Sequence, residues 1–345
     1  MRIKSLSRRR KSEIGALLIG SAILAAPVTS ALADGPTVSL GAGMRTSFTH
    51  TAPDSGNDTD NFTLDSARIY INGSVTDNIK FTFNTEYTGS TNLVQIMDAI
   101  GRFEINDMFN IWAGRFLPPS DRANLYGPYY ANNVKPYVDG VADFYPTVAV
   151  GRDNGVAYWG QFGPVKVSVG AFDGPSATSS TSVLGAARVM VDIWDPEPGY
   201  YLNGTYYGDK DILAFGVATQ IQAGNKASSI DGLMEKKLGT AGTLSVEAEY
   251  QKDEDLVAGN NHGYYGLVSF LFPAEIGIGK LQPLVKYGEK TYVGTSDVKL
   301  KTTEVDLNYI IKAFNARVSL FYLGQKLDPP GTDDKQYGLT LQLQM

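Results

Sequence analysis

The feature that most constrains the fold of this chain is an alternation of apolar and polar residues with a period of two. Over residues 38–48 the even positions are mostly apolar and the odd positions are small or polar, and over 337–345 the odd positions are apolar. Side chains of a β-strand point alternately to opposite faces, so each stretch predicts a strand with one apolar and one polar face. The same pattern recurs at 79–87, 165–170, 244–251 and 304–312.

Both ends of the chain are therefore predicted to be strands. A closed barrel requires this arrangement, because its first and last strands must pair with each other. We expect residues 38–48 and 337–345 to be neighbouring antiparallel strands that close one barrel.

The first 33 residues have the three parts of a secretory signal peptide. Residues 8–11 are basic, residues 14–28 are apolar, and Ala31 and Ala33 supply small residues before Asp34. The apolar run is shorter than the roughly 18 residues that mark a transmembrane helix. We predict a leader over residues 1–33, cleaved after Ala33, and a barrel domain over residues 34–345.

A soluble β-sandwich would also show period-two alternation, with its apolar face turned inward. Two features favour a barrel in the outer membrane of a Gram-negative bacterium. The leader directs the chain out of the cytoplasm, and aromatic residues near strand ends match the interfacial girdles of membrane barrels. In lipid a sheet must close, because an open edge leaves backbone groups unpaired. The predicted fold is an all-β, closed, transmembrane antiparallel barrel surrounded by outer-membrane lipid.

The connections between predicted strands alternate between short turns and longer polar loops. Eight long loops give 16 strands, provided that residues 195–210 form one unusually long periplasmic connection. If residues 200–207 instead cross the membrane, the count becomes 18. The long outer loops are expected at 50–61, 88–92, 117–147, 173–182, 223–231, 253–261, 291–297 and 325–335.

The third outer loop, residues 117–147, is the longest and follows the fifth predicted strand. Its aromatic content favours a loop that folds into the lumen and narrows it. The alternative is an ordered surface loop at a subunit contact. The residues that we expect at the constriction are Tyr126, Tyr129, Tyr130, Tyr137, Phe144 and Tyr145.

Seven of the eight arginines after residue 33 fall inside predicted strands. A lipid-facing arginine at mid-bilayer costs about 2–4 kcal/mol, so alternation should turn these side chains into the lumen. Acidic residues alternate inward as well, and pairing across neighbouring strands is an equally good explanation for both sets. The parity of Arg152 and Asp153 is ambiguous, because only one of two adjacent residues can face inward. The predicted lumen-lining cations are Arg45, Arg68, Arg102, Arg115, Lys166, Arg188, Lys286 and Arg317.

Composition excludes several classes of function. Six of the 30 Lys and Arg and one of the 36 Asp and Glu lie in residues 1–33, which leaves 24 cations, 35 anions and a net charge of −11. Such a chain without a basic tract is not expected to bind nucleic acid. There is no Cys, and His50 and His262 are the only imidazoles, so nucleophilic or metal chemistry has few groups to use. We expect no enzymatic activity, catalytic residue, metal site or cofactor.

These observations predict a passive, water-filled channel for small hydrophilic, mainly anionic solutes. Two other functions remain open. One is a structural outer-membrane barrel, either a sheath for a periplasmic partner or an adhesin-like surface protein. The other is an outer-membrane enzyme, which would need a nucleophile, a base and an orienting group at the outer face.

Several short stretches occur in a characteristic order after residue 33. They are 64–68 followed by Gly73, 112–116 with 118–119, 151–156, 199–208 leading into 210–216, and 279–283 leading to 286–287. Through these stretches the chain resembles the phosphate-selective porin O and P family along its whole length. The resemblance implies a homotrimer of 16-stranded barrels, with the third loop folded inward. It also implies strand arginines that line a path for small ions, phosphate-type anions among them.

Overall fold

The computed structural model describes residues 36–345, apart from 90–91, 142–150, 175–181 and 257–258. The predicted leader lies outside the described residues, so its cleavage stays a prediction. Within the described ranges, no helix combines the length and the apolar character needed to cross a bilayer.

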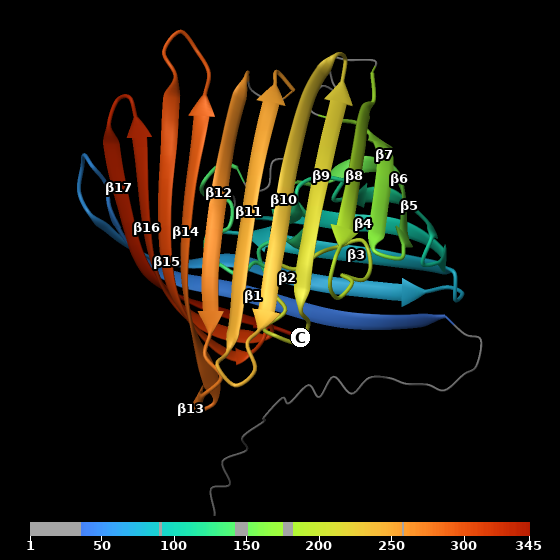
Figure 1. The fold of residues 1–345 in the computed structure, drawn as a ribbon, viewed down its shortest axis with the longest axis horizontal. Helices are drawn as coiled ribbons and strands as arrows, with labels where there is room; N and C mark the ends of the chain where they lie inside the picture. Colours follow the sequence, from blue (N-terminus) through green and yellow to red (C-terminus); the bar gives the residue numbers. More distant parts are fainter. Residues whose placement is uncertain (1–35, 90–91, 142–150, 175–181, 257–258) are drawn as a thin grey trace, which may run out of the picture. The chain divides into compact units, whose positions relative to one another are not determined.

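The described residues form one antiparallel sheet in which each wall strand pairs with the next wall strand along the chain, β12 with β14 included, and β1 pairs with β17 to close it (Figure 1). Sixteen strands make the wall, which confirms the predicted closed barrel. The additional strand β13 pairs only with the start of β14, within the turn after β12. The strands are β1 (Thr37–Ala52), β2 (Thr59–Ser74), β3 (Ile79–Thr88), β4 (Leu93–Asn106), β5 (Phe109–Phe116), β6 (Asp153–Phe162), β7 (Val165–Phe172), β8 (Leu184–Asp192), β9 (Ile212–Gln222), β10 (Asn225–Lys237), β11 (Thr243–Glu254), β12 (Asn261–Leu271), β13 (Glu275–Ile276), β14 (Gly279–Tyr292), β15 (Val298–Lys312), β16 (Ala316–Asp328) and β17 (Thr332–Gln344).

The barrel closes through the two terminal strands, as the sequence predicts. Their register runs from Gly43 opposite Gln344 to Ala52 opposite Lys335. The pairing extends one residue further, because Met345 N–H donates to the Ala42 carbonyl at 2.9 Å and the Met345 carbonyl accepts from Ala42 N–H at 3.1 Å. The terminal residue is therefore part of the closed wall.

The outward face of the wall is apolar and the inward face is polar. Large side chains such as Val217, Leu320 and Leu339 are exposed on the outer side, whereas Gln220, Ser319 and Thr340, which precede or follow them on the same strands, are buried. So much exposed apolar surface would be unfavourable in water and matches the lipid-facing band of a membrane barrel.

Two long connections occur in this fold. Residues 117–152 join β5 to β6 and contain the short helix α1 (Arg122–Tyr126), and residues 193–211 join β8 to β9 at the same barrel end as the two termini. Residues 193–211 contain no strand. The count of 16 is therefore confirmed, and the alternative of 18 strands is wrong.

Several predicted outer loops are shorter in the structure, and two of them reduce to tight turns. The loop predicted at 223–231 is a turn of two residues, because β10 begins at Asn225, and the loop predicted at 325–335 reduces to residues 329–331. Both stretches are polar and so resemble loops in sequence. Strands can extend beyond the apolar membrane band into water, where polar residues on both faces are not penalised.

Candidate functional site

The loop after β5 lies against the inner wall of the barrel. We call residues 117–141 the inward loop. Arg45 Nη2 donates to the Val134 carbonyl at 2.8 Å, and Arg317 Nη1 donates to the carbonyls of Ala131 and Asn132 at 3.0 and 3.1 Å. These arginines come from β1 and β16, on the face opposite lipid. The predicted inward folding of this loop is therefore confirmed.

Further charged side chains of the wall hold the same loop. Lys286 Nζ lies 2.6 Å from Asp139 Oδ2 and donates to the Pro136 carbonyl at 2.8 Å. Glu304 accepts from Lys135 N–H at 2.7 Å, and Asp306 accepts from Val134 N–H at 2.9 Å. Charges of both signs thus anchor the loop. Since all three wall side chains are buried, they contribute little free charge to a passing ion.

Two of the predicted constriction tyrosines, Tyr126 and Tyr129, contact the wall, whereas Tyr130 packs on the turn between β15 and β16 and Tyr137 contacts the inward loop itself. Tyr126 hydroxyl donates to Glu247 at 3.0 Å, Tyr129 hydroxyl lies 2.8 Å from Ser66 Oγ, and Tyr137 hydroxyl donates to the Ala123 carbonyl at 3.3 Å. The Tyr130 ring packs edge-on against Phe314, with ring centres 5.2 Å apart. Phe144 and Tyr145 lie outside the described residues.

The connection from β8 to β9, residues 193–211, also folds into the lumen, which the sequence did not predict. We call it the periplasmic connection. Leu202 N–H donates to the Leu125 carbonyl at 3.2 Å, and Gly204 N–H donates to the Tyr130 carbonyl at 2.9 Å. Tyr200 donates to the Leu117 carbonyl at 2.8 Å. Two segments that enter from opposite ends of the barrel therefore meet inside it.

A buried charge network joins these two segments to the wall. Arg122 of the inward loop forms an ion pair with Glu197 of the periplasmic connection, and both side chains are fully buried. Arg188 of β8 binds Asp231 of β10 through two contacts of 2.5 and 2.7 Å. Lys166 of β7 donates to the Glu197 carbonyl at 2.5 Å. The predicted lumenal cations Lys166 and Arg188 therefore serve this junction.

The helix α1 begins at an unusual carboxylate. Asp121 is its N-cap and accepts from Asn124 N–H at 2.8 Å. Burial raises the pKa of Asp121 to about 6, although the Asn124 N–H donor opposes this shift, and the neighbouring Asp231 adds to it. A charged Asp121 is therefore unfavourable in the folded loop at neutral pH.

We expect Asp121→Asn to raise thermal stability at pH 7.5 and to raise it by about half as much at pH 5. The folded-state pKa lies above the ordinary value of 3.8, so the folded protein binds more protons than the unfolded chain between these values. Stability then falls as pH rises from about 4 to about 6, by at most about 3 kcal/mol. Asn keeps the capping contact without the charge. Melting temperatures of both proteins at the two pH values test this, and an equal gain at both contradicts it.

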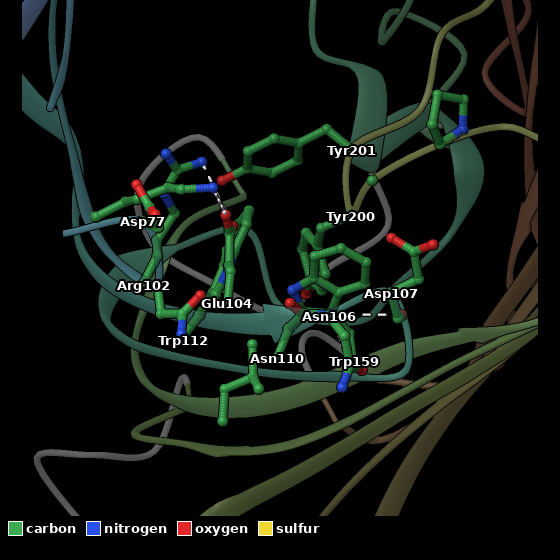
Figure 2. Close-up of a pocket in the computed structure, with 15 residues that line it drawn as sticks. Asp77, Arg102, Glu104, Asn106, Asp107, Asn110, Trp112, Trp159, Tyr200 and Tyr201 are labelled. Carbon is green, nitrogen blue, oxygen red and sulfur yellow. Dashed lines mark hydrogen bonds and ion pairs between the residues drawn. The ribbon is translucent and has the colours of Figure 1, made fainter. Parts of the chain in front are cut away.

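Two cavities remain inside the barrel on the side of β2, β3 and β4, and we refer to them together as the passage. A cavity of about 250 Å³, which we call the middle cavity, lies between these strands, the inward loop and residues 201–203. A cavity of about 610 Å³ continues from it towards the turns after β2 and β4 and shares Arg102 and Tyr201 with it (Figure 2). The inward loop and the periplasmic connection therefore narrow the lumen from the other side of this passage.

The charges of this passage are partly paired. Arg68 forms an ion pair with Glu86, and Arg152 Nε lies 3.3 Å from Asp98 Oδ1. Glu104 contacts two cations: its Oε2 lies 3.0 Å from Lys80 Nζ, and its Oε1 lies 3.6 Å from Arg102 Nη1. Three arginines and one carboxylate line the middle cavity itself: Arg68, Arg102, Arg152 and Asp98.

Arg115 was predicted to line the lumen, but in the structure it faces outward. It lies opposite Ala99 of β4 and Asn154 of β6, and its Nε donates to the Ile96 carbonyl at 3.2 Å on the exposed side. Trp112 and Phe116, on the other face of β5, pack inside the barrel. Arg115 is tolerated there because it sits at the end of β5, where a lipid-facing arginine costs about 0–1 kcal/mol.

An aromatic cluster inside the barrel explains why Trp112 and Phe116 face inward and Arg115 faces outward. Tyr200 of the periplasmic connection packs on Trp112, Phe116 and Trp159, with ring centres 4.8, 6.1 and 6.2 Å apart. Figure 2 shows Trp112, Trp159, Tyr200 and Tyr201 together at the cavity. Aromatic residues were expected on the lipid side, but here the connection supplies an apolar partner within the lumen. The sequence feature that indicates this packing is the set of tyrosines in the periplasmic connection, namely Tyr200, Tyr201, Tyr206 and Tyr207.

Comparison with known proteins identifies the fold. OprB of Pseudomonas putida matches with a TM-score of 0.63 at 9% identity, over 90% of this chain and 94% of OprB. An anion-selective porin from Comamonas acidovorans matches with a TM-score of 0.60 at 14% identity, over 90% of this chain and 100% of the porin. This protein has the fold of an outer-membrane porin.

A third match is the trimer form of OmpT, an outer membrane protein of Vibrio cholerae, with a TM-score of 0.57 at 13% identity over 90% of this chain and 100% of OmpT. No family model and no curated protein sequence matches the chain. The barrel belongs to the outer membrane, whereas membership of the phosphate-selective porin O and P family stays a prediction.

Proposed function

We propose that this protein is a passive outer-membrane porin whose passage prefers small anions. The observation that carries the proposal is the lining of the middle cavity, where Arg68, Arg102 and Arg152 face one carboxylate, Asp98. Rings of arginine favour anions in a narrow pore. Exposed charges more than about 8–10 Å away are largely screened at physiological salt, so the net charge of −11 does not decide selectivity.

Arg102 contributes most of the uncompensated charge in this proposal. Arg68 and Arg152 each have a carboxylate partner, whereas Arg102 shares Glu104 with the closer Lys80. Arg45, Arg317 and Lys286 hold the inward loop, and Arg188 and Lys166 hold the junction of the two inserted segments. These five are expected to shape the passage more than to select the ion.

Replacing Arg102 by Gln should shift the zero-current potential in a KCl gradient towards cation preference. The change removes one positive charge where the passage is narrow and leaves Glu104 paired with Lys80. Arg115→Gln is the matched control, since it removes the same charge from the outward face. Planar-bilayer recording measures both. A wild-type channel that prefers cations, or equal shifts in the two variants, would overturn the anion preference.

A structural barrel is the second candidate, and the filled lumen favours it. The inward loop and the periplasmic connection occupy much of the interior, and a sheath or an adhesin needs no conducting path. Absence of channel activity from a correctly folded barrel in the same recordings would favour this function over a porin.

We further propose a homotrimer in which each barrel has its own passage, with phosphate-type anions among its solutes. The resemblance to phosphate-selective porins and the trimer form of Vibrio cholerae OmpT support this assembly. No enzymatic activity is proposed.

A further inference from the structure

The middle cavity contains hydrogen-bond donors that have no acceptor in the protein. Arg68 Nε, Arg102 Nε and the hydroxyl groups of Tyr70 and Tyr201 are buried and lack a hydrogen-bond partner. All four residues line the same space of about 250 Å³. Figure 2 shows the Tyr201 hydroxyl directed towards the charged groups of Arg102 and Glu104. Buried donors without acceptors are unfavourable, so this cavity is built to receive oxygen atoms from outside the protein.

The charge of the cavity is suited to a monoanion. The ion pairs of Arg68 with Glu86 and of Arg152 with Asp98 are each neutral. The remaining group of Lys80, Arg102 and Glu104 carries a single positive charge. One negative charge would neutralise this site, whereas a dianion would leave an excess of negative charge close to Asp98 and Glu104.

The cavity has two unlike sides. Strands β2, β3 and β4 supply polar groups, among them Asn72, Thr82 and Asn84. The inserted segments supply an apolar side that consists of Leu117, Leu125, Leu202 and the rings of Tyr126, Tyr130 and Tyr201. A hydrated inorganic ion would use the polar side and leave the apolar side in contact with water.

The size of the cavity sets a limit on the solute. A water molecule takes about 30 Å³ in the liquid, so 250 Å³ holds about eight waters, or one small planar organic ion. An aromatic ring of that size would contact the tyrosines while its charged group reaches Arg102.

We propose that the middle cavity is a binding site for a small aromatic monocarboxylate, with its carboxylate between Arg102 and the Tyr201 hydroxyl. The ring then lies against the leucine and tyrosine side formed by the inward loop and residues 201–202. This proposal rests on the porin function and names the solute class that the passage binds.

Benzoate is the probe, and Tyr201→Phe is the central variant because it removes only the hydroxyl group. Benzoate should interrupt the single-channel current with a saturable concentration dependence. Tyr201→Phe should raise the dissociation constant about tenfold, which corresponds to 1.4 kcal/mol. Tyr264→Phe is the matched control, since Tyr264 is exposed on the outward face of β12 and should bind benzoate like the wild type. Arg102→Gln replaces Tyr201→Phe if the latter does not fold.

Two comparison ligands and one direct binding measurement separate the outcomes. Cyclohexanecarboxylate and phosphate should both bind more weakly than benzoate. Equal binding of phosphate and benzoate, or equal affinity in Tyr201→Phe and Tyr264→Phe, would overturn the proposal. Isothermal titration calorimetry on the refolded barrel needs no current. Channels without benzoate binding would refute the site alone, and benzoate binding without channels would refute the porin function alone.

Discussion

Deleting residues 126–139 is expected to raise the single-channel conductance several-fold. These residues form most of the inward loop, which is held by Arg45, Arg317 and Lys286 from three strands of the wall. A 16-stranded barrel encloses an aqueous channel when its lumen is not filled. Removing the loop exposes the wall charges to water, where they no longer need partners. Planar-bilayer recording at fixed KCl concentration measures the change.

The control for this deletion is removal of residues 54–57 in the exposed connection between β1 and β2, which contains Ser55 and Gly56. This variant shortens the chain without touching the lumen, so its conductance should match that of the wild type. If the loop deletion leaves the conductance unchanged while the barrel folds, the inward loop does not limit the passage. The periplasmic connection would then be the limiting segment.

Replacing Glu197 by Ala is expected to destabilise the barrel by about 3–5 kcal/mol. The change leaves Arg122 fully buried without its main partner, and an unpaired buried charge is strongly unfavourable. The weaker contact of Arg122 Nε with Asp231, at 3.8 Å, only partly compensates. Thermal unfolding followed by tryptophan fluorescence measures the effect, since Trp112 and Trp159 pack against the same connection.

A double variant distinguishes the buried charge from simple loss of packing. Arg122→Met combined with Glu197→Met removes both charges and keeps side-chain volume, so its stability should lie close to that of the wild type. Asp211→Asn removes a partner of the exposed Lys236 and should change stability little, because solvent screens that pair. A double variant as unstable as Glu197→Ala would show that the unpaired charge of Arg122 is not the main cause of the lost stability.

These two results would bear on how the passage is formed. The inward loop enters from the outer end and the periplasmic connection from the other, and the Arg122 and Glu197 pair joins them. A change on the periplasmic side could therefore alter the passage without touching its lining. Increased current noise in Glu197→Ala would be the expected sign of a less firmly held loop.

Local pattern was sufficient to predict the wall. Alternation over residues 38–48 and 337–345 predicted the first and last strands, and they pair from Gly43 to Ala52 as a closed barrel requires. The same alternation predicted that Arg188 and Arg317 face inward. A strand has only two faces, and a charge in lipid is unfavourable, so the sequence of a strand determines which face points inward.

Alternation failed where the lumen itself contains apolar material. Arg115 was expected inside, but Trp112 and Phe116 occupy the inner face of β5 because Tyr200 packs on them. Asp231 was assigned to a loop, although it binds Arg188 across the sheet. In each case the partner comes from a segment distant in the sequence, so neighbouring residues give no sign of it.

The sequence by itself determined the closed barrel, a count of 16 or 18 strands, and the inward direction of most charged side chains. It could do so because each strand residue faces either lipid or the lumen. The structure decided for 16 strands. Only the tertiary structure decided which of those charges hold inserted segments and which face the passage. Which role a charged side chain takes depends on its height in the barrel, which the strand register sets. It also depends on where the two connections meet inside the barrel. Arg317 and Arg102 have the same inward parity, yet one binds the inward loop and the other lines the middle cavity.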